Sequence, residues 1–370
     1  MTLYLDNAAT THICKEVLDE MKKSLDNYGN TEAKYYCFAE NAKKDVSLAR
    51  DRIAKAVGCE SDEVIFTSGA TEANNLVLKG FANANPDKKK IIISSIEHSS
   101  IKETCDYLET LGYVIVEIPV DKMGLIDLNI LDKSIDDNTL LVSIILVNNE
   151  IGTIQDVKAI NDICEKYNVV LHMDATQAVG KVNINMSLYN SLKFLTFTAH
   201  KIYGPKGIGA LIIRKTNGYK TKICPLFHGG EQEEGYRAGT LSNELIVGFG
   251  KACELATKDI IADNKKLKLL EDVLINKLKL KFGKFIKINN DFERRIPGII
   301  NLQFVGQNNM ILLQQMAPIV AASTGSACSV SKPSRVLKAL GLSDKEISSS
   351  IRLSLSKYQE ADDLNIIDLL

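Results

Sequence analysis

A lysine stands directly after an apolar run in the second half of the chain. The run Phe194–Thr198 is followed by Ala199, His200 and Lys201, and then by the glycine-rich turn 204–209. A lysine at the end of a buried strand loses its proton more readily than one in water, because removal from water disfavours the charged form. A neutral lysine amine forms Schiff bases with aldehydes. Lys201 is therefore a candidate anchor for a carbonyl group.

Two further groups complement such a lysine. The segment 68–75 passes from an apolar run through small residues into a helical pattern, and its backbone N–H groups and the Thr71 hydroxyl suit a phosphate at a helix N-terminus. Asp174 follows another apolar run, and a carboxylate there can keep a pyridine nitrogen protonated. Lysine, carboxylate and phosphate cradle together indicate pyridoxal 5'-phosphate.

Each of these residues also has an ordinary structural explanation. A lysine after a strand is commonly a solvated turn residue, Asp174 could cap a helix, and His98 alone would more often be a satisfied structural histidine. The turn 204–209 matches neither the dinucleotide fingerprint nor a Walker A loop. The joint occurrence of these groups favours the cofactor site.

The elements that must position these residues alternate along the chain. Strands are expected at Val64–Ser68, Ile91–Ser95, Tyr113–Ile118, Leu140–Val147, Val169–Met173, Phe194–Thr198 and Ala210–Arg214. Helices are expected at Glu72–Ala84, Ser99–Leu111 and Ala159–Tyr167. Nearly continuous apolar runs are typical of parallel strands covered on both faces. The predicted fold class is α/β, with a mainly parallel seven-stranded sheet flanked by helices and ligands at the carboxyl ends of the strands.

The pattern changes in the last third of the chain. One long helical stretch is expected from Asn243 to about Lys281, followed by a smaller α/β unit. Within that unit Ser343 and Glu346 predict a capping box, and Ile351–Leu355 predicts a strand. We expect an N-terminal segment at 1–15 that packs with the small domain, a large cofactor-binding domain at 16–255, and a small C-terminal domain at 256–370.

The composition limits the class of protein further. With 370 residues, 45% of them apolar, the chain is expected to form two domains. The 45 basic and 46 acidic residues argue against a general nucleic-acid or membrane surface, and neither a signal peptide nor a transmembrane run is expected. The eight cysteines form no C-x-x-C pair, so no metal site or disulfide framework is indicated and a reducing cytoplasm is the expected location.

Longer motifs carry a family resemblance. They are YLDNAATT, FTSGATEANN, SIEHSSI, VNNEIGTIQ, HMDATQAVGK, TAHKIYGPKGIGAL, RAGTLSN, GSACS and SIRLSLSK, and they span residues 4 to 357. In these stretches the sequence closely resembles the cysteine desulfurases of the NifS/IscS type, in the class V aminotransferase family of fold type I pyridoxal-phosphate enzymes. The resemblance implies an L-cysteine desulfurase that gives L-alanine and an enzyme-bound persulfide. The sulfur would pass to an acceptor protein for iron–sulfur cluster assembly or for thiolation of tRNA or a cofactor.

The resemblance also implies roles for individual residues. Lys201 would carry the cofactor, Asp174 would pair with the pyridine nitrogen, and Gln177 would bond the phenolic oxygen of the ring. His98 would stack on the ring and move protons. Further cofactor contacts would come from Ala70, Thr71, Asn149, Thr198, His200 and, across a homodimer with shared active sites, Thr240. The substrate would be bound by Arg352, Asn149 and Asn30.

Cys328 is the candidate nucleophile. It lies in STGSACSVSKPS, where small polar residues on both sides are typical of an accessible loop, and a reactive thiolate needs access. The resemblance implies that the Cys328 thiolate attacks the substrate sulfur, with His98 and Lys201 as proton carriers. The other seven cysteines are interpreted as inert small hydrophobes.

Three departures from the family stand out. The segment 29–41 lacks the usual Pro-Ser-Ser and a histidine, and Glu231 and Glu234 stand where glycine and often a basic residue are usual. Five positions separate Cys328 from Pro333, about two fewer than in the long-loop desulfurases, which removes at most ~7 Å of reach. We therefore expect slower sulfur transfer or a different acceptor.

Two alternatives to the desulfurase interpretation are left open. One is a selenocysteine lyase or an aminotransferase-like enzyme that uses the same site. The other is a non-catalytic scaffold homologue.

Overall fold

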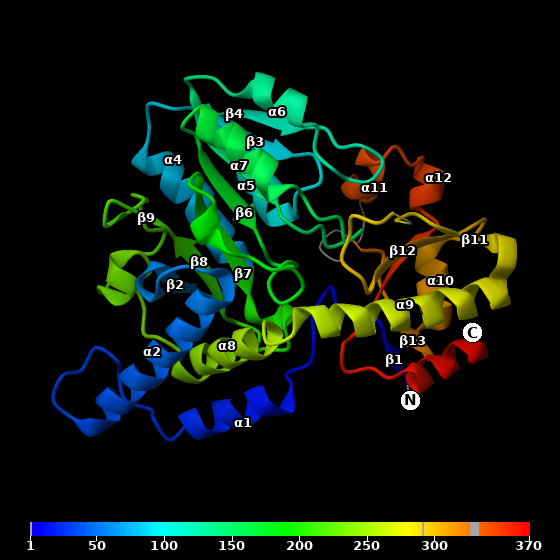
Figure 1. Ribbon diagram of the computed structural model, residues 1–370, viewed down its shortest axis with the longest axis horizontal. Coiled ribbons are helices and arrows are strands. Elements are labelled where there is room, and N and C mark those ends of the chain that lie inside the picture. Colours follow the sequence, from blue (N-terminus) through cyan, green and yellow to red (C-terminus); the bar gives the residue numbers. More distant parts are fainter. Residues whose placement is uncertain (1, 291, 326–332) are drawn as a thin grey trace.

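A seven-stranded sheet forms the centre of the larger part of the molecule (Figure 1). The computed structural model describes residues 2–290, 292–325 and 333–370. The strand order is β2 (Val64–Thr67), β8 (Gly209–Ile213), β7 (Leu192–Thr198), β6 (Val170–Asp174), β5 (Thr139–Ile145), β3 (Lys90–Ser94) and β4 (Val114–Ile118). Only β8 runs antiparallel to its neighbours, so the predicted mainly parallel seven-stranded sheet is confirmed.

Helices cover both faces of this sheet because alternate strand residues face opposite sides. Ile91 and Ile93 pack with one cluster of helices, and Ile92 packs with the other. The first cluster involves α3 (Ala70–Asn75), which continues through a π-helical turn (Leu76–Gly80) into α4 (Phe81–Ala84), and α5 (Ser99–Thr110). The second involves α2 (Cys37–Val57), α6 (Leu128–Ser134), α7 (Val157–Lys166) and α8 (Asn243–Ala256), and α1 (Lys15–Ser24) packs along α8.

The prediction of one continuous helix from Asn243 to about Lys281 is wrong at one point. The structure breaks it into α8 and α9 (Ile260–Phe282). The break occurs because the Asp259 carboxylate accepts a hydrogen bond from Ala262 N at 2.9 Å and so begins a new helix. The break lets α8 pack on the large sheet while α9 extends to the smaller unit (Figure 1).

The smaller unit is built on an antiparallel sheet. It contains β11 (Ile286–Ile288), β12 (Ile299–Phe304) and β14 (Ser350–Ser354), together with α10 (Asn309–Met316), α11 (Arg335–Ala339) and α12 (Asp344–Ile347). Leu270, Leu274 and Leu278 of α9 are buried in its core. The predicted capping box of Ser343 and Glu346 is confirmed at the start of α12.

The N-terminal segment joins the two units. Strand β1 (Leu3–Tyr4) pairs in parallel with β13 (Val320–Ala321) of the smaller unit. A few residues later Thr11 N donates to His200 O at the end of β7. Residues 5–11 therefore lie between the smaller unit and the carboxyl edge of the large sheet.

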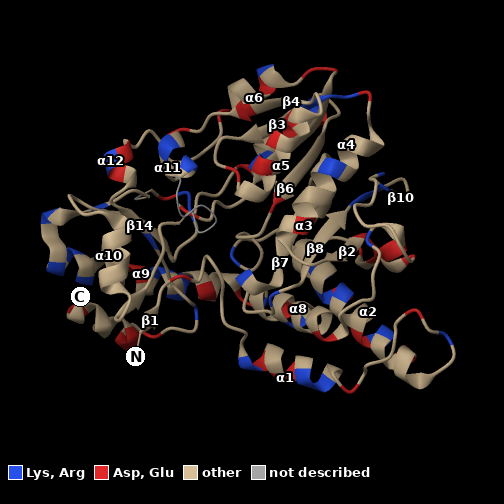
Figure 2. Cartoon of the chain, turned by 180° about the vertical axis from the view of Figure 1, so that it is seen from behind, with Lys and Arg blue, Asp and Glu red and all other residues tan. Residues whose placement is uncertain are grey.

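The charged residues are spread over the molecule. Figure 2 shows Lys and Arg interspersed with Asp and Glu along the outer helices rather than collected on one face. In the described ranges, no helix combines the length and the apolar composition that crossing a membrane would need.

Candidate active site

Lys201 lies at the carboxyl edge of the sheet, as its sequence context predicts. Strand β7 ends at Thr198, and the next three residues form a single 3₁₀ turn that closes with Lys201. The Lys201 amine donates to the carbonyl oxygens of Ala8 at 2.8 Å and Ala9 at 2.6 Å. The N-terminal segment therefore positions the side chain of the candidate anchor.

Asp174 is the last residue of β6 and is 2% exposed. Its Oδ1 accepts from Thr176 N and its Oδ2 from Asn74 Nδ2, both at 2.9 Å. His172 lies beneath it, and burial lowers the pKa of this imidazole to about 4 although the charge of Asp174 opposes the shift. A neutral His172 carries no positive charge that would compete with a protonated pyridine nitrogen for Asp174.

Asn74 connects Asp174 to His98, and we did not single it out from the sequence. Its amide nitrogen donates both to Asp174 Oδ2 and to Ser100 Oγ at 2.8 Å. Because Ser100 Oγ accepts this bond, its own proton is available to His98 Nδ1 at 2.9 Å, and Ser100 N also donates to His98 Nδ1 at 3.1 Å. His98 Nδ1 is thus an acceptor, which places the proton of the neutral ring on Nε2.

Gln177 donates a hydrogen bond to the same carbonyl oxygen as Lys201. Its Nε2 donates to Ala8 O at 2.8 Å, so Ala8 O accepts from Gln177 and from Lys201 together. The other end of the amide, Oε1, accepts from the ammonium of Lys181 at 2.5 Å. Gln177 is 2% exposed. Lys181 stands in the HMDATQAVGK motif, but its contact with Gln177 could not be read from that motif.

The predicted phosphate turn is closely packed. A Cβ atom on Gly209 would lie 2.7 Å from Gly69 Cα, so the turn 68–71 packs directly against the backbone of Gly209. Thr71 is exposed in the first turn of α3, and Ala70 begins that helix. Thr198 Oγ1 donates to Ile208 O at 2.9 Å and is committed to the turn after β7.

His200 lies beside this turn and is neutral. Its Nδ1 lies 3.2 Å from Thr10 Oγ1. Burial, assisted by the charges of Lys201 and Lys206, lowers the pKa of its imidazole to about 4. A neutral imidazole still has one N–H to donate, which is the group that a phosphate oxygen would accept.

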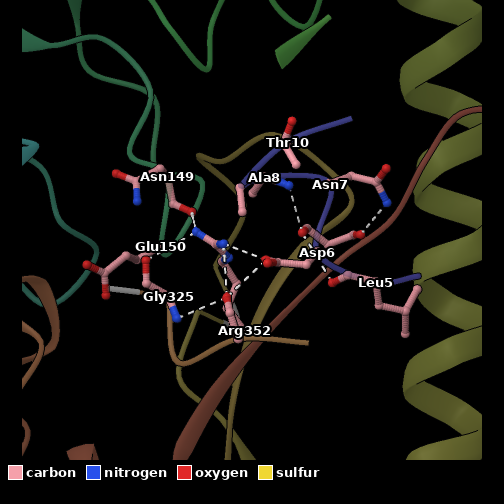
Figure 3. A network of polar contacts seen from close by, with 12 residues as sticks. Leu5, Asp6, Asn7, Ala8, Thr10, Asn149, Glu150, Gly325 and Arg352 are labelled. Carbon is pink, nitrogen blue, oxygen red and sulfur yellow. Dashed lines mark hydrogen bonds and ion pairs between the residues drawn. The ribbon is translucent and has the colours of Figure 1, made fainter. Parts of the chain in front are cut away.

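Arg352 is the centre of a second polar network (Figure 3). The side chain comes from β14, is 1% exposed, and forms an ion pair with Asp6 Oδ1 at 2.7 Å. Its Nη1 donates to Asn149 O at 2.9 Å and to Gly325 O at 3.3 Å. Among the residues described, none accepts a hydrogen bond from its buried Nε. Arg352 therefore already binds one carboxylate, that of Asp6, and retains a donor for another. The sequence alone indicates no role for Asp6.

Glu150 joins the residues on either side of the segment that contains Cys328. Ser334 Oγ donates to Glu150 Oε2 at 2.6 Å, and a Cβ atom on Gly325 would lie 3.2 Å from the same oxygen. Burial raises the pKa of the Glu150 carboxyl. Cys328 itself lies outside the described residues, but Gly325 and Ser334 place both ends of its segment beside Asn149 and Arg352.

Two predicted site residues lie elsewhere in a single copy of the chain. Asn30 and Thr240 line a hollow of about 230 Å³ between the 24–31 loop and the start of α8, whereas Lys201 lines a different cavity. The loop that leads to Thr240 is anchored by Glu233, which is buried and paired with Arg50 at 2.6 Å. Glu234, one of the departures from the family, pairs with Lys220 at 2.6 Å.

The residues fit pyridoxal 5'-phosphate. A lysine amine, a buried carboxylate, an amide and a histidine meet at one edge of the sheet beside a turn of small residues. This edge, at the carboxyl ends of parallel strands, is where α/β proteins bind ligands. The fold and the site together define a pyridoxal-phosphate-dependent enzyme.

Comparisons with known proteins give the family. The aminotransferase class-V model matches residues 3–367. The cysteine desulfurase IscS of Clostridium botulinum (strain Kyoto / Type A2) is 41% identical over 372 residues, covering 99% of this chain and 92% of the relative. A solved structure described as a NifS-like protein has a TM-score of 0.92 at 33% identity, covering 100% of this chain and 98% of the other. A structure of SspA in complex with cysteine has a TM-score of 0.84 at 33% identity, covering 97% and 100%.

The chain therefore belongs to the class-V aminotransferase family. Within that family it is a pyridoxal-phosphate-dependent cysteine desulfurase, with L-cysteine as its substrate and a sulfur acceptor downstream.

Proposed function

We propose that Cys328 receives the sulfur of L-cysteine and carries it as a persulfide to an acceptor protein. The Cys328 thiolate attacks the substrate sulfur, an S–S bond forms, and the C–S bond breaks. The electron pair of that bond stays with the substrate carbon, which is then protonated, so the product is L-alanine. The observation that supports this proposal concerns the residues on either side of the Cys328 segment. Gly325 contacts Arg352, and Ser334 contacts Glu150, at the edge of the site.

The cofactor would be held by residues that already meet at the sheet edge. Lys201 would bind it covalently, Asp174 would pair with the pyridine nitrogen, and Gln177 would bond the phenolic oxygen. The phosphate contacts would come from Ala70, Thr71, His200 and Thr198, whose hydroxyl would exchange its bond to Ile208 O for the phosphate. Asn149 would lie near the substrate side. Bound pyridoxal 5'-phosphate supplies an electron sink for the substrate carbons.

His98 and Lys201 would move the protons. The His98 ring receives hydrogen bonds at Nδ1 from Ser100, so Nε2 is the nitrogen that exchanges a proton with the substrate. The Lys201 amine would be a second proton carrier in the same site whenever it is not bonded to the cofactor.

Arg352 would bind the substrate carboxylate. Its guanidinium is buried and faces Asp6, a geometry that suits a planar anion. Asp6 and the substrate carboxylate compete for the same guanidinium unless the substrate uses the unpartnered Nε. Asn149, whose carbonyl oxygen accepts from Arg352, lies beside this position (Figure 3).

A second copy of the chain would complete the site. The hollow lined by Asn30 and Thr240 lies next to exposed aromatic residues, of which Tyr28 is 74% and Tyr35 is 95% exposed. Exposed aromatic side chains at such density mark protein interfaces. A homodimer that covers this surface would bring Thr240 of the partner subunit to the phosphate.

The acceptor is proposed to be a protein of the cytoplasm that works in iron–sulfur cluster assembly or in thiolation of tRNA or a cofactor. Mass spectrometry of the holoenzyme incubated with L-cysteine, with alanine measured in parallel, tests the proposal. We expect one additional sulfur atom on the Cys328 peptide and stoichiometric alanine.

The matched variant is Cys328→Ala, which should retain the cofactor and lose at least about a hundredfold in alanine formation, because the nucleophile is missing. Cys37→Ala, at an exposed cysteine of α2, is the control and should behave as the wild type. Full alanine formation by Cys328→Ala, or a ketoacid product, would contradict the proposal.

A further inference from the structure

Lys181 is a charged residue beside Gln177 that has no role in the proposed mechanism. It lies four residues after Gln177, at the end of the turn that follows β6, and its side chain is mostly buried. Its ammonium donates to Gln177 Oε1 at 2.5 Å. The same side chain lines the cavity that contains Lys201. A lysine at this position carries a charge next to the cofactor-binding lysine.

The amide of Gln177 has a defined orientation because its two neighbours have opposite hydrogen-bonding character. The protonated Lys181 amine can only donate, so below its pKa of about 7 it must face Oε1. The Ala8 carbonyl can only accept, so it must face Nε2, at 2.8 Å. A rotation of the amide by 180° would set donor against donor and acceptor against acceptor. The contacts with Lys181 and Ala8 therefore fix which end of Gln177 faces the site.

The backbone of Lys181 is itself held in place. Asn264 Nδ2 of α9 donates to Lys181 O at 2.8 Å. Gly180 has a φ of +73°, and a Cβ atom there would lie 2.6 Å from Ala256 Cβ, so only glycine allows this turn to approach the end of α8. The position of Lys181 thus depends on both long helices that follow the large sheet.

We propose that Lys181 is a positioning residue that holds the Gln177 amide with its N–H₂ group toward the phenolic oxygen of the cofactor. This inference rests on the proposed role of Gln177 in cofactor binding. Without the ammonium, only the Ala8 carbonyl still opposes rotation of the amide, and a rotated amide would set its carbonyl oxygen against the phenolic oxygen.

The free energy of unfolding distinguishes a positioning role of Lys181 from a structural role. Burial, together with the charges of Lys201 and Arg352, lowers the pKa of Lys181 from 10.5 to about 7. The unfolded chain therefore binds more protons than the folded chain between about pH 7 and 10.5, and stability rises with pH across that window. Lys181→Met removes this unfavourable charge, so the cofactor-free variant should be at least as stable as the wild type.

The test is a double-mutant cycle on cofactor affinity. The dissociation constant of pyridoxal 5'-phosphate is measured by absorbance titration of the cofactor-free full chain for the wild type, Lys181→Met, Gln177→Leu and the double variant. We expect Lys181→Met to weaken binding about tenfold, the size of one lost charge-assisted hydrogen bond. In the Gln177→Leu background the same substitution should change affinity less than about twofold, because no amide remains to be oriented.

Two further variants complete the design. Lys181→Arg also presents only donors and should keep affinity within about threefold of the wild type. Lys158→Met, at a lysine of α7 that is 76% exposed, should change nothing. Wild-type affinity in Lys181→Met, or an effect that adds in full to that of Gln177→Leu, would overturn the inference. Failure of the wild-type chain to bind the cofactor would instead overturn the proposed function.

Discussion

Asn74 shows how one side chain can set the chemistry of two others. Its amide nitrogen bonds Asp174 and Ser100, and its oxygen accepts from Thr196 Oγ1. Thr196 in turn lies 3.1 Å from His172 Nε2. The Ser100 backbone N–H favours the Nε2–H tautomer of His98, and the orientation of Asn74 leaves the Ser100 Oγ proton available to support the same tautomer.

Asn74→Leu should therefore weaken the preference of His98 for the Nε2–H tautomer. The variant leaves Asp174 and Ser100 each without one buried partner, which costs about 1–3 kcal/mol of folding free energy per group. We expect alanine formation to fall about tenfold or more, since a positioned acid–base residue contributes at least that much. Nitrogen chemical shifts of ¹⁵N-labelled histidine should show the Nε2–H tautomer of His98 in the wild type and a smaller share of it in the variant, where only the Ser100 N–H still bonds Nδ1.

The matched control is the neighbouring Asn75. Its amide donates to Thr71 O at 3.0 Å and, in the described structure, bonds no residue of the Asp174 network. Asn75→Leu should leave the His98 signals unchanged. Identical His98 signals in Asn74→Leu and the wild type would show that Asn74 does not set the tautomer.

At the scale of elements, α9 is tied to the loop before β12 by a buried ion pair. The Glu271 carboxylate accepts from Arg295 Nη1 at 2.9 Å, from Arg295 Nη2 at 2.5 Å and from Gly298 N at 2.8 Å. Neighbouring residues of this loop bond the turn after β5, where Ile296 N donates to Gly152 O at 2.9 Å. The loop thus links α9 to the segment that holds Asn149 and Glu150.

Glu271→Gln should destabilise the protein in a pH-dependent way. Removing one partner of a buried pair costs about 3 kcal/mol at pH 7. Burial alone would raise the pKa of Glu271, but the hydrogen bonds and charge of Arg295 outweigh it and lower the pKa below 4.5. The contribution is therefore complete above about pH 4.5 and is lost as the pH falls through the folded-state pKa.

Urea unfolding of wild type and Glu271→Gln at several pH values measures this effect. The difference in unfolding free energy should be largest near neutral pH and should shrink below pH 4.5. Asp272→Asn is the control, because its carboxylate is half-exposed and its ion pair in the described structure is with exposed Lys268. It should change stability by less than about 0.5 kcal/mol. A constant difference between Glu271→Gln and wild type across the pH range would contradict the assignment.

At the scale of the whole molecule, the exposed aromatic surface predicts self-association. Tyr28 stacks on Phe38 at 5.1 Å between ring centroids, and Tyr35, three residues before Phe38, is almost wholly exposed. Light scattering after size exclusion should give twice the mass of one chain for the wild type. The double variant Tyr28→Glu/Tyr35→Glu should shift toward one chain and release cofactor more readily, because Thr240 of the partner subunit would be lost.

Leu280→Glu provides the comparison for this experiment. Leu280 is 88% exposed on α9, in the smaller unit. A charge there should leave the mass unchanged. A wild-type mass of one chain at micromolar concentration would contradict the proposed dimer.

The sequence predicts the local parts of this molecule well. Strand and helix positions follow from runs and periodicity, and the Ser343–Glu346 capping box needs only four consecutive residues. The single long helix after Asn243 was wrong because the leucine and lysine pattern continues past Asp259, where a side-chain cap ends the periodicity. Local patterns thus identify elements but not every boundary.

The supporting residues of the site could not be predicted in the same way. Asn74 meets Asp174 across 100 positions, and Asp6 meets Arg352 across 346. Hydrophobic periodicity does not encode such contacts. The residues that carry the chemistry stood out because of their type at a strand end, whereas their partners are ordinary polar residues until the fold brings them together.

The first eleven residues have a consequence for biosynthesis. Leu3 pairs with Val320, Asp6 with Arg352, and the carbonyl of Ala8 with Lys201. The ribosome makes this segment before its partners, which extend as far as β14. The pocket is therefore assembled only after β14 has been translated, and vitamin B6 is captured by a polypeptide that includes β14 rather than by a shorter one.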